Sequence, residues 1–271
     1  MLLRALHHQV VRRVKAVDAW DFDQEEPTFG HRTILWEHEG DFYCARWLER
    51  IFNPTPENER DLFQTATLVP RDYYLGDLPP LGAATRAAST ALSNPNVYLK
   101  KIEPYMFDPE RSGTEQDHPL AVTTMHEMRV CEVLSQSPHP NLCRYLGYMP
   151  TPDGNHVLGL CFERYERNLS SAVEAKVVFD PVAVIDGLRR GLQHLHSLRY
   201  AHNDINPTNI MLDNNALPVI IDFDSCRRLG EELEKAGTPD WDHDRDVSLP
   251  ENDLDGLEKV QKWLDQNYIT V

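Results

Sequence analysis

The residues best suited to chemistry lie in one short stretch, residues 200–226. Asp204 and Asn209 stand five positions apart in a polar loop, and Asp222 follows an apolar run that begins at Pro218. A hairpin over Asn209–Asp222 brings two oxygen-bearing side chains together, from opposite ends of one loop. Asp and Asn are also common turn residues, so unrelated acids in turns are the alternative interpretation.

The elements around this stretch predict how it is positioned. Apolar residues at spacings of three and four predict an amphipathic helix over 181–199 that leads into the loop. Two short apolar runs, 209–212 and 218–223, predict the strands on either side of an Asp-Asn-Asn turn. Further predicted elements are strands at 97–102, 142–149 and 156–163 and helices at 123–134 and 252–265.

The first part of the chain is less regular. Residues 1–16 predict a short basic helix, and two β-rich runs around a glycine turn predict a hairpin over 33–47. Residues 52–61 are interpreted as a loop, residues 76–96 as a long connection and residues 103–120 as a polar loop, from their breakers and weak periodicity.

The stretch His202-Asn203-Asp204 followed by Asn209, with Asp222-Phe223-Asp224, resembles the signatures H-R-D-x-x-x-x-N and D-F-G of the eukaryotic protein-kinase family. The resemblance implies that Asp204 meets the attacking hydroxyl and that Asn209 and Asp222 hold Mg²⁺ across the phosphates of ATP. It further implies that His202 orients the loop. Phosphoryl transfer is mainly positioning and neutralisation of developing charge, which fits these roles.

Segments upstream extend the resemblance. Val97-Tyr98-Leu99-Lys100 resembles the strand motif V-A-I-K, which implies that Lys100 contacts the phosphates, with Lys101 as the alternative. Glu127 is the implied ion-pair partner of that lysine, and Glu132 is its rival. The segment 139–148 resembles the connection into the fourth strand of the family, so Phe162, Glu163 and Arg164 become the linker that offers backbone groups to adenine.

The implied fold is α+β and bilobal, with a β-rich N-lobe and a shortened, mainly helical C-lobe. The boundaries are an N-terminal extension over 1–30, an N-lobe over 31–162 with an insertion at about 48–96, and a C-lobe over 163–271. Gly237-Thr238-Pro239 resembles the end of an activation segment. Asp253 is the expected buried anchor of the catalytic loop. The usual C-lobe is larger, so the helical platform that holds peptide substrates is expected to be cut short.

Four departures from the family pattern weaken the expectation of full activity. No Gly-x-Gly-x-x-Gly precedes Lys100, and the hairpin at 33–47 is one candidate for the missing strands. Asn203 replaces an arginine that pairs with a phosphorylated activation loop, so control by such phosphorylation is not expected. Asn206 replaces a lysine near the γ-phosphate, which removes a cation. Asp224 replaces the glycine of D-F-G.

Composition limits the classes of partner and compartment. The net charge of −16 repels nucleic-acid phosphates, so nucleic-acid binding is not expected. No apolar stretch reaches the roughly 18–20 residues of a membrane span. Five cysteines without a C-x-x-C pair indicate buried thiols in a reducing compartment. We therefore expect an intracellular protein, cytoplasmic or nuclear.

The leading hypothesis is an ATP- and Mg²⁺-dependent phosphotransferase, a serine/threonine protein kinase-like enzyme with an unidentified phosphoacceptor. A catalytically weak pseudokinase scaffold is the first alternative, because of the missing glycine loop and Asn206. A small-molecule kinase of the choline or aminoglycoside type is the second, because His-Asn-Asp and Ile-Asp-Phe-Asp also resemble that branch.

Overall fold

The computed structural model describes residues 12–21, 28–51, 53–80, 82–105, 107, 108, 110, 120–233, 238, 240, 241 and 245–268. The chain divides into two compact units. The first comprises Met1–Gly76 and Ile102–Thr123, and the second comprises Asp77–Lys101 and Thr124–Val271. Each unit is described by itself.

The first unit is built on an antiparallel sheet in the order β1 (Arg12–Asp21), β2 (Thr28–His38), β3 (Asp41–Trp47) and β4 (Thr67–Leu68). The predicted hairpin is confirmed as β2 and β3. Glu39 and Gly40 turn the chain with φ of 54° and 84°, the left-handed conformation that two-residue hairpin turns require. Both faces of the sheet are covered, because Leu35, Phe42 and Cys44 belong to one buried cluster and Ile34, Trp36 and Ala45 to another.

Two expectations for this unit are wrong. Residues 12–16 of the expected basic helix lie in β1, which pairs along β2, while residues 1–11 lie outside the described residues. Residues 56–61 of the expected loop at 52–61 are helical, because α1 (Pro56–Gln64) begins there. Thr55 caps this helix by accepting from the Asn58 amide, and proline occupies its first turn, both ordinary signals for a helix start. A four-residue helix, α2 (Arg71–Tyr74), follows.

The second unit begins with a sheet in which β8 (His156–Glu163) pairs antiparallel with β6 (Val97–Lys101) and β7 (Tyr145–Pro150). The short β5 (Gly76–Asp77) completes it. Helix α3 (Leu120–Ser135) precedes β7. Because β2 and β3 belong to a different sheet from β6, the hypothesis that the 33–47 hairpin supplies the strands missing beside β6 is wrong.

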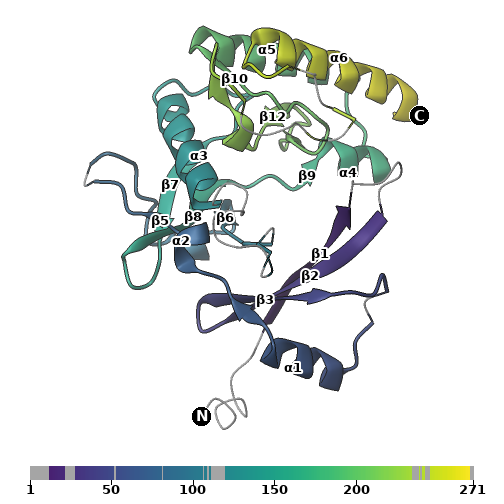
Figure 1. The fold of residues 1–271 in the computed structure, drawn as a ribbon. Coiled ribbons are helices and arrows are strands. Elements are labelled where there is room, and N and C mark those ends of the chain that lie inside the picture. Colours follow the sequence, from purple (N-terminus) through teal and green to yellow (C-terminus); the bar gives the residue numbers. More distant parts are fainter. Residues whose placement is uncertain are drawn as a thin grey trace. The chain divides into compact units, whose positions relative to one another are not determined.

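Three helices complete this unit: α4 (Leu169–Glu174), α5 (Pro181–Ser197) and α6 (Pro250–Asn267). In Figure 1, α5 and α6 run side by side. Helix α5 starts at the Asp180 cap and buries Leu188, Leu192 and Leu195, as its periodicity predicts. Among the described residues, none of the helices combines the length and apolar character that crossing a membrane requires.

Short strands surround the catalytic stretch. They are β9 (Arg167–Asn168), β10 (Tyr200–Ala201), β11 (Ile210–Leu212), β12 (Pro218–Ile220) and β13 (Arg227–Arg228). The predicted hairpin is confirmed, since β11 pairs antiparallel with β12. Gly187 lets α5 approach β12 closely, because a Cβ there would lie 2.5 Å from Pro218 Cγ.

Candidate active site

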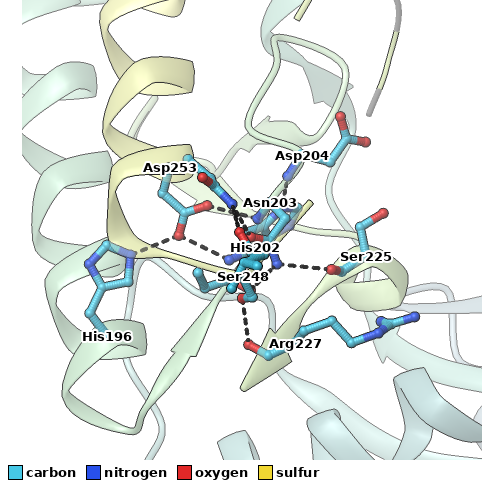
Figure 2. Close-up of polar contacts among 11 residues, drawn as sticks. His196, His202, Asn203, Asp204, Ser225, Arg227, Ser248 and Asp253 are labelled. Carbon is cyan, nitrogen blue, oxygen red and sulfur yellow. Dashed lines mark hydrogen bonds and ion pairs between the residues drawn. The ribbon is translucent and has the colours of Figure 1, made fainter. Parts of the chain in front are cut away.

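The backbone of the loop after β10 is fixed by one buried carboxylate on α6. Asp253 is fully buried, and it accepts hydrogen bonds from the amides of His202 at 2.9 Å and Asn203 at 2.8 Å. His196 Nε2 contacts the same carboxylate at 2.7 Å. Figure 2 shows these contacts converging on Asp253. Buried backbone amides need partners, so Asp253 determines where the loop can lie.

Asn203 forms an uncharged network where the family motif has an arginine. Its Nδ2 contacts the carbonyls of Ala201 and Ser225 and the Ser248 hydroxyl at 3.0–3.1 Å, and Figure 2 shows the contact with Ser225. Asn252 Nδ2 donates to Asn203 Oδ1 at 3.0 Å. Asn203 has φ of 65°, a left-handed conformation that Asn tolerates better than most residues. The network therefore supports the loop without a cation.

His202 is buried and connects the loop to the strand that carries Asp222. The Asp204 amide donates to His202 Nδ1 at 3.3 Å, so Nε2 is the atom available to donate to the Ile221 carbonyl at 2.9 Å. The imidazole also packs edge-on against the fully buried Phe223, with ring centroids 5.6 Å apart. These contacts give His202 an orienting position.

The Asp204 carboxylate is held by the side-chain amides of Asn209 and Asn206. Asn209 Nδ2 donates to Asp204 Oδ2 at 2.9 Å, and Asn206 Nδ2 donates to Asp204 Oδ1 at 3.1 Å. Asn206 Oδ1 in turn accepts from the Thr208 amide and hydroxyl. Thr238 Oγ1 donates to Asp204 Oδ1 at 2.8 Å. Gly237 and Pro239, the other residues of the predicted activation-segment motif, lie outside the described residues.

Lys100 joins β6 to α3 and to the catalytic hairpin. Its Nζ lies 2.8 Å and 2.9 Å from the two Glu127 oxygens and 2.6 Å from Asp222 Oδ1. Burial acts to lower the pKa of Lys100, but Glu127 and Asp222 outweigh it and hold that pKa well above its ordinary value. Burial raises the pKa of Glu127 against the lowering by Lys100. The ammonium is therefore charged and shared between two carboxylates.

The rival glutamate has a different partner. Glu132 accepts from the Thr85 amide at 2.6 Å and from the Thr85 hydroxyl at 2.9 Å. The segment around Thr85 also bonds to β7 through Tyr148. Nearer the start of α3, His126 Nε2 contacts the Cys226 carbonyl at 2.7 Å. Helix α3 is thus attached at both Glu127 and Glu132, which keeps Glu127 beside Lys100.

Asp222 adopts a strained backbone conformation at the end of the β12 segment. Its φ of 66° and ψ of 76° are left-handed, which costs a non-glycine residue energy and is frequent at functional sites. The Ile221 amide donates to the Asn209 carbonyl at 3.0 Å, and this bond keeps the two predicted ligand residues adjacent. The 3₁₀ turn Phe223–Ser225 follows, with Asp224 Oδ1 accepting from the Ser225 hydroxyl.

A cavity of about 340 Å³ adjoins Lys100 and Asp222. Its wall includes Glu163, Arg164 and Tyr165 at the end of β8, as well as Phe162. The Glu163 amide donates to the Arg144 carbonyl and the Arg164 amide to the Asn96 carbonyl. Predicted ligand-binding residues from β6, α3, the β8 end and the hairpin therefore line one concave site, of a size typical for small-molecule binding.

The residues present fit a bound Mg²⁺. Because Asn209 Nδ2 is engaged by Asp204, the side-chain oxygen of Asn209 is the atom that could donate to a metal, together with the carboxylate of Asp222. One amide oxygen and one carboxylate, completed by phosphate oxygens and water, are a normal Mg²⁺ set. Within the described ranges, no group of three His, Cys, Asp or Glu side chains forms a separate metal cluster.

Comparison with known families agrees with this geometry. Residues 99–243 match the family model described as the protein kinase domain, and this range is more than half of the 271-residue chain. The chain therefore belongs to the protein-kinase domain family. The kinase fold of this family is α+β, in agreement with the strands and helices observed.

Similar curated proteins are protein kinases of greater length. The chain is 30% identical over 124 residues to the serine/threonine-protein kinase/endoribonuclease IRE1 of Hypocrea jecorina, which covers 38% of this chain and 10% of that protein. It is 30% identical over 115 residues to the serine/threonine-protein kinase shk2 of Schizosaccharomyces pombe, covering 40% and 19%. It is also 30% identical over 120 residues to the cysteine-rich receptor-like protein kinase 45 of Arabidopsis thaliana, covering 39% and 32%. The chain thus matches less than a third of each relative's length.

Sequence reasoning missed the parts played by several residues at this site. Asn206 was interpreted as a lost cation, but its amide is almost fully buried and bonds to both Asp204 and Thr208. The sequence also gives no sign that Tyr98 lines the cavity or that Glu132 contacts Thr85. An Asn with Thr two residues later in a tight loop is a recognisable side-chain-to-backbone turn signal, whereas the Glu132 contact has no local signal.

Proposed function

We propose that the chain is an ATP- and Mg²⁺-dependent phosphotransferase that transfers phosphate to a serine or threonine hydroxyl of a protein. The observation that carries the proposal is the shared position of the Lys100 ammonium between Glu127 and Asp222. It neutralises charge at the place where the phosphates of a nucleotide in the adjoining cavity would lie. Phosphoryl transfer depends mainly on such positioning and electrostatic stabilisation.

In this proposal Asp204 accepts the proton of the attacking hydroxyl. A hydroxyl acceptor is supported by Thr238, whose own hydroxyl donates to the Asp204 carboxylate at 2.8 Å. Asn206 and Asn209 hold that carboxylate in place, and His202 orients the loop. Asn209 and Asp222 would hold Mg²⁺, which when bound neutralises charge on the phosphates. Backbone carbonyls of Glu163 and Arg164 would meet the adenine edge, because the amides of both residues already donate within the fold.

The proposal includes the finer architecture. β6–β8 and α3 would form the sheet-rich lobe, and α4–α6 with the catalytic hairpin would form a smaller helical lobe. Of the predicted boundaries, the one at residue 163 between the two lobes belongs to this proposal, whereas a sheet-rich lobe that starts at residue 31 does not, because the 33–47 hairpin lies in a different sheet from β6.

The test combines nucleotide binding with turnover. The full chain is incubated with Mg²⁺ and ATP and with a mixed panel of serine- and threonine-containing peptides, and ADP release and phosphopeptide formation are measured. Asp204→Asn should lower turnover at least about 100-fold, the usual scale of a lost general base, while MgATP binding persists. Asp222→Asn should remove the Mg²⁺ dependence of binding. Asp265→Asn, an exposed carboxylate on α6, is the matched control.

Binding is read by thermal shift. Ligand at about 100 times its dissociation constant should stabilise the chain by roughly 2.7 kcal/mol. If the wild type turns over no faster than Asp204→Asn and Asp222→Asn, the phosphotransferase proposal is lost and a scaffold role remains. Release of ADP with small hydroxylated metabolites but without any peptide product would instead reject the protein acceptor.

A further inference from the structure

The Thr85 segment, residues 85–87, pairs with the outer edge of β7. The Ala87 amide donates to the Tyr148 carbonyl and the Tyr148 amide donates to the Thr85 carbonyl, both at 2.9 Å. Arg86 and Tyr148 form a parallel bridge. Ala87 is buried in one apolar cluster with residues of β6, β7 and β8. This part of the predicted long connection is therefore attached to the sheet that carries the candidate site.

The close approach of this segment depends on Gly147 in β7. Gly147 has φ of 116°, and a Cβ there would lie 2.5 Å from the Ala87 nitrogen and 2.7 Å from the Thr85 carbonyl oxygen. Glycine alone adopts that backbone angle freely and leaves that space open. The outer edge of β7 is thus shaped to accept the Thr85 segment.

Thr85 connects the sheet to α3 through Glu132. Its amide and its hydroxyl donate to the two Glu132 carboxylate oxygens, at 2.6 Å and 2.9 Å. Hydrogen bonds to a charged acceptor are stronger than those between neutral groups. Because the Thr85 carbonyl is bound by the Tyr148 amide, all three polar groups of Thr85 have partners, and the β7 backbone sets the position of this residue.

The contacts of Glu127 and Glu132 together fix the rotation of α3. Residues five positions apart on an α-helix lie about 7.5 Å apart along the axis and about 140° apart around it. Lys100 on β6 holds Glu127, whereas Thr85 holds Glu132 from the outer edge of β7. A rotation of α3 that carried Glu127 away from Lys100 would therefore also break the contact between Glu132 and Thr85.

We propose that Thr85 is a positioning residue for phosphoryl transfer, which acts through Glu132 to hold α3 in the orientation that pairs Glu127 with Lys100. The inference rests on the proposed function, because Lys100 is assigned there to the phosphates. It adds a determinant that lies outside the nucleotide cavity and is supplied by the chain itself. A small misplacement of a charged group can weaken its action even when the changed residue lies far from the ligand.

The experiment measures calorimetric binding of MgATP to the full chain and its variants. Thr85→Val keeps the shape of the side chain but removes the hydroxyl, and it should weaken binding about 5- to 10-fold, the scale of one hydrogen bond. Thr85→Ser restores the hydroxyl and should stay within about 2-fold of the wild type. Thr90→Val is the matched control, at an exposed threonine whose side chain does not cap the 3₁₀ turn that follows it.

A second arm tests the route through Glu127. In Glu127→Gln the carboxylate that pairs with Lys100 is already lost, so adding Thr85→Val should weaken MgATP binding by less than about 2-fold more. If Thr85 only stabilised the fold, its replacement would weaken binding equally in the wild-type and Glu127→Gln backgrounds.

The outcomes separate the two proposals. Unchanged affinity in Thr85→Val, or an equal loss in the two backgrounds, overturns the positioning role while the proposed function stands. A loss in Thr85→Ser as large as that in Thr85→Val also overturns it, because the hydroxyl is then not the contact that matters. Absence of MgATP binding by the wild type overturns the proposed function, and the positioning role with it.

Discussion

Replacing Asn203 tests whether an uncharged network supports the catalytic loop. The matched pair Asn203→Gly and Asn203→Ala removes the same hydrogen bonds but differs in backbone cost, because Asn203 has φ of 65°. Glycine adopts that conformation freely, whereas a Cβ makes it unfavourable by roughly 1–2 kcal/mol. The two variants therefore separate the side-chain network from backbone strain at one position.

The magnitude follows from the contacts of Asn203. Its amide has two N–H groups, shared among Ala201, Ser225 and Ser248, and one oxygen that accepts from Asn252. These amount to three protons, each contributing about 1 kcal/mol net when buried. We expect Asn203→Gly to lower the free energy of unfolding of the second unit by about 3 kcal/mol, and Asn203→Ala to lower it by about 1 kcal/mol more.

The assay is urea unfolding read by hydrogen exchange in peptides from residues 181–226, so that the second unit is followed by itself. With a slope of about 2 kcal/mol/M, the midpoint should fall by about 1.5 M in Asn203→Gly at unchanged slope. Asn267→Ala, at an exposed amide on α6, should stay within about 0.5 kcal/mol of the wild type. The reasoning is refuted if both Asn203 variants also stay within that limit, or if glycine is the less stable of the two.

Two further predictions concern α3. Burial lowers the pKa of His126 from 6.5, so its neutral form is favoured in the fold. The unfolded chain then binds the proton more tightly, so stability is lost as pH falls below about 6.5. His126→Gln should reduce the loss seen between pH 7.5 and 5.5 in urea unfolding, and equal losses would reject the explanation. Glu132→Gln should reduce hydrogen-exchange protection of α3 by about 1.5–3 kcal/mol, because it removes the charged acceptor of the Thr85 amide and hydroxyl. Thr85→Val removes only the hydroxyl bond and should cost less. The loss in the double variant should be smaller than the sum of the two single losses, and fully additive losses would show that the two side chains act separately.

Local sequence signals were sufficient for most elements of the second unit. The spacing of Leu188, Leu192 and Leu195 predicted α5, and the apolar runs on either side of Asp213 predicted the β11–β12 hairpin. In both cases the apolar pattern reflects burial of the element, and such a pattern can be recognised from residues close together in the sequence. The predicted loop at 52–61 failed because composition outweighed the cap at Thr55.

The sequence by itself predicted the two acids and the amide of the catalytic stretch. Asp204, Asn209 and Asp222 are close along the chain, so their types and spacing carried the prediction. The choice between Glu127 and Glu132 was different. Both glutamates lie on α3. Packing of this helix against β6 and the Thr85 segment places Glu127 beside Lys100 and Glu132 beside Thr85.

Only the tertiary structure decided how these residues are supported. Asp253 lies far along the chain from His202, yet its carboxylate fixes the loop amides. Asn203 appears from sequence as a missing arginine, but the fold places it where Ser248 and Asn252 complete an uncharged network. The physical reason is that a buried polar group must find partners wherever packing brings them, and such partners need not be near in sequence.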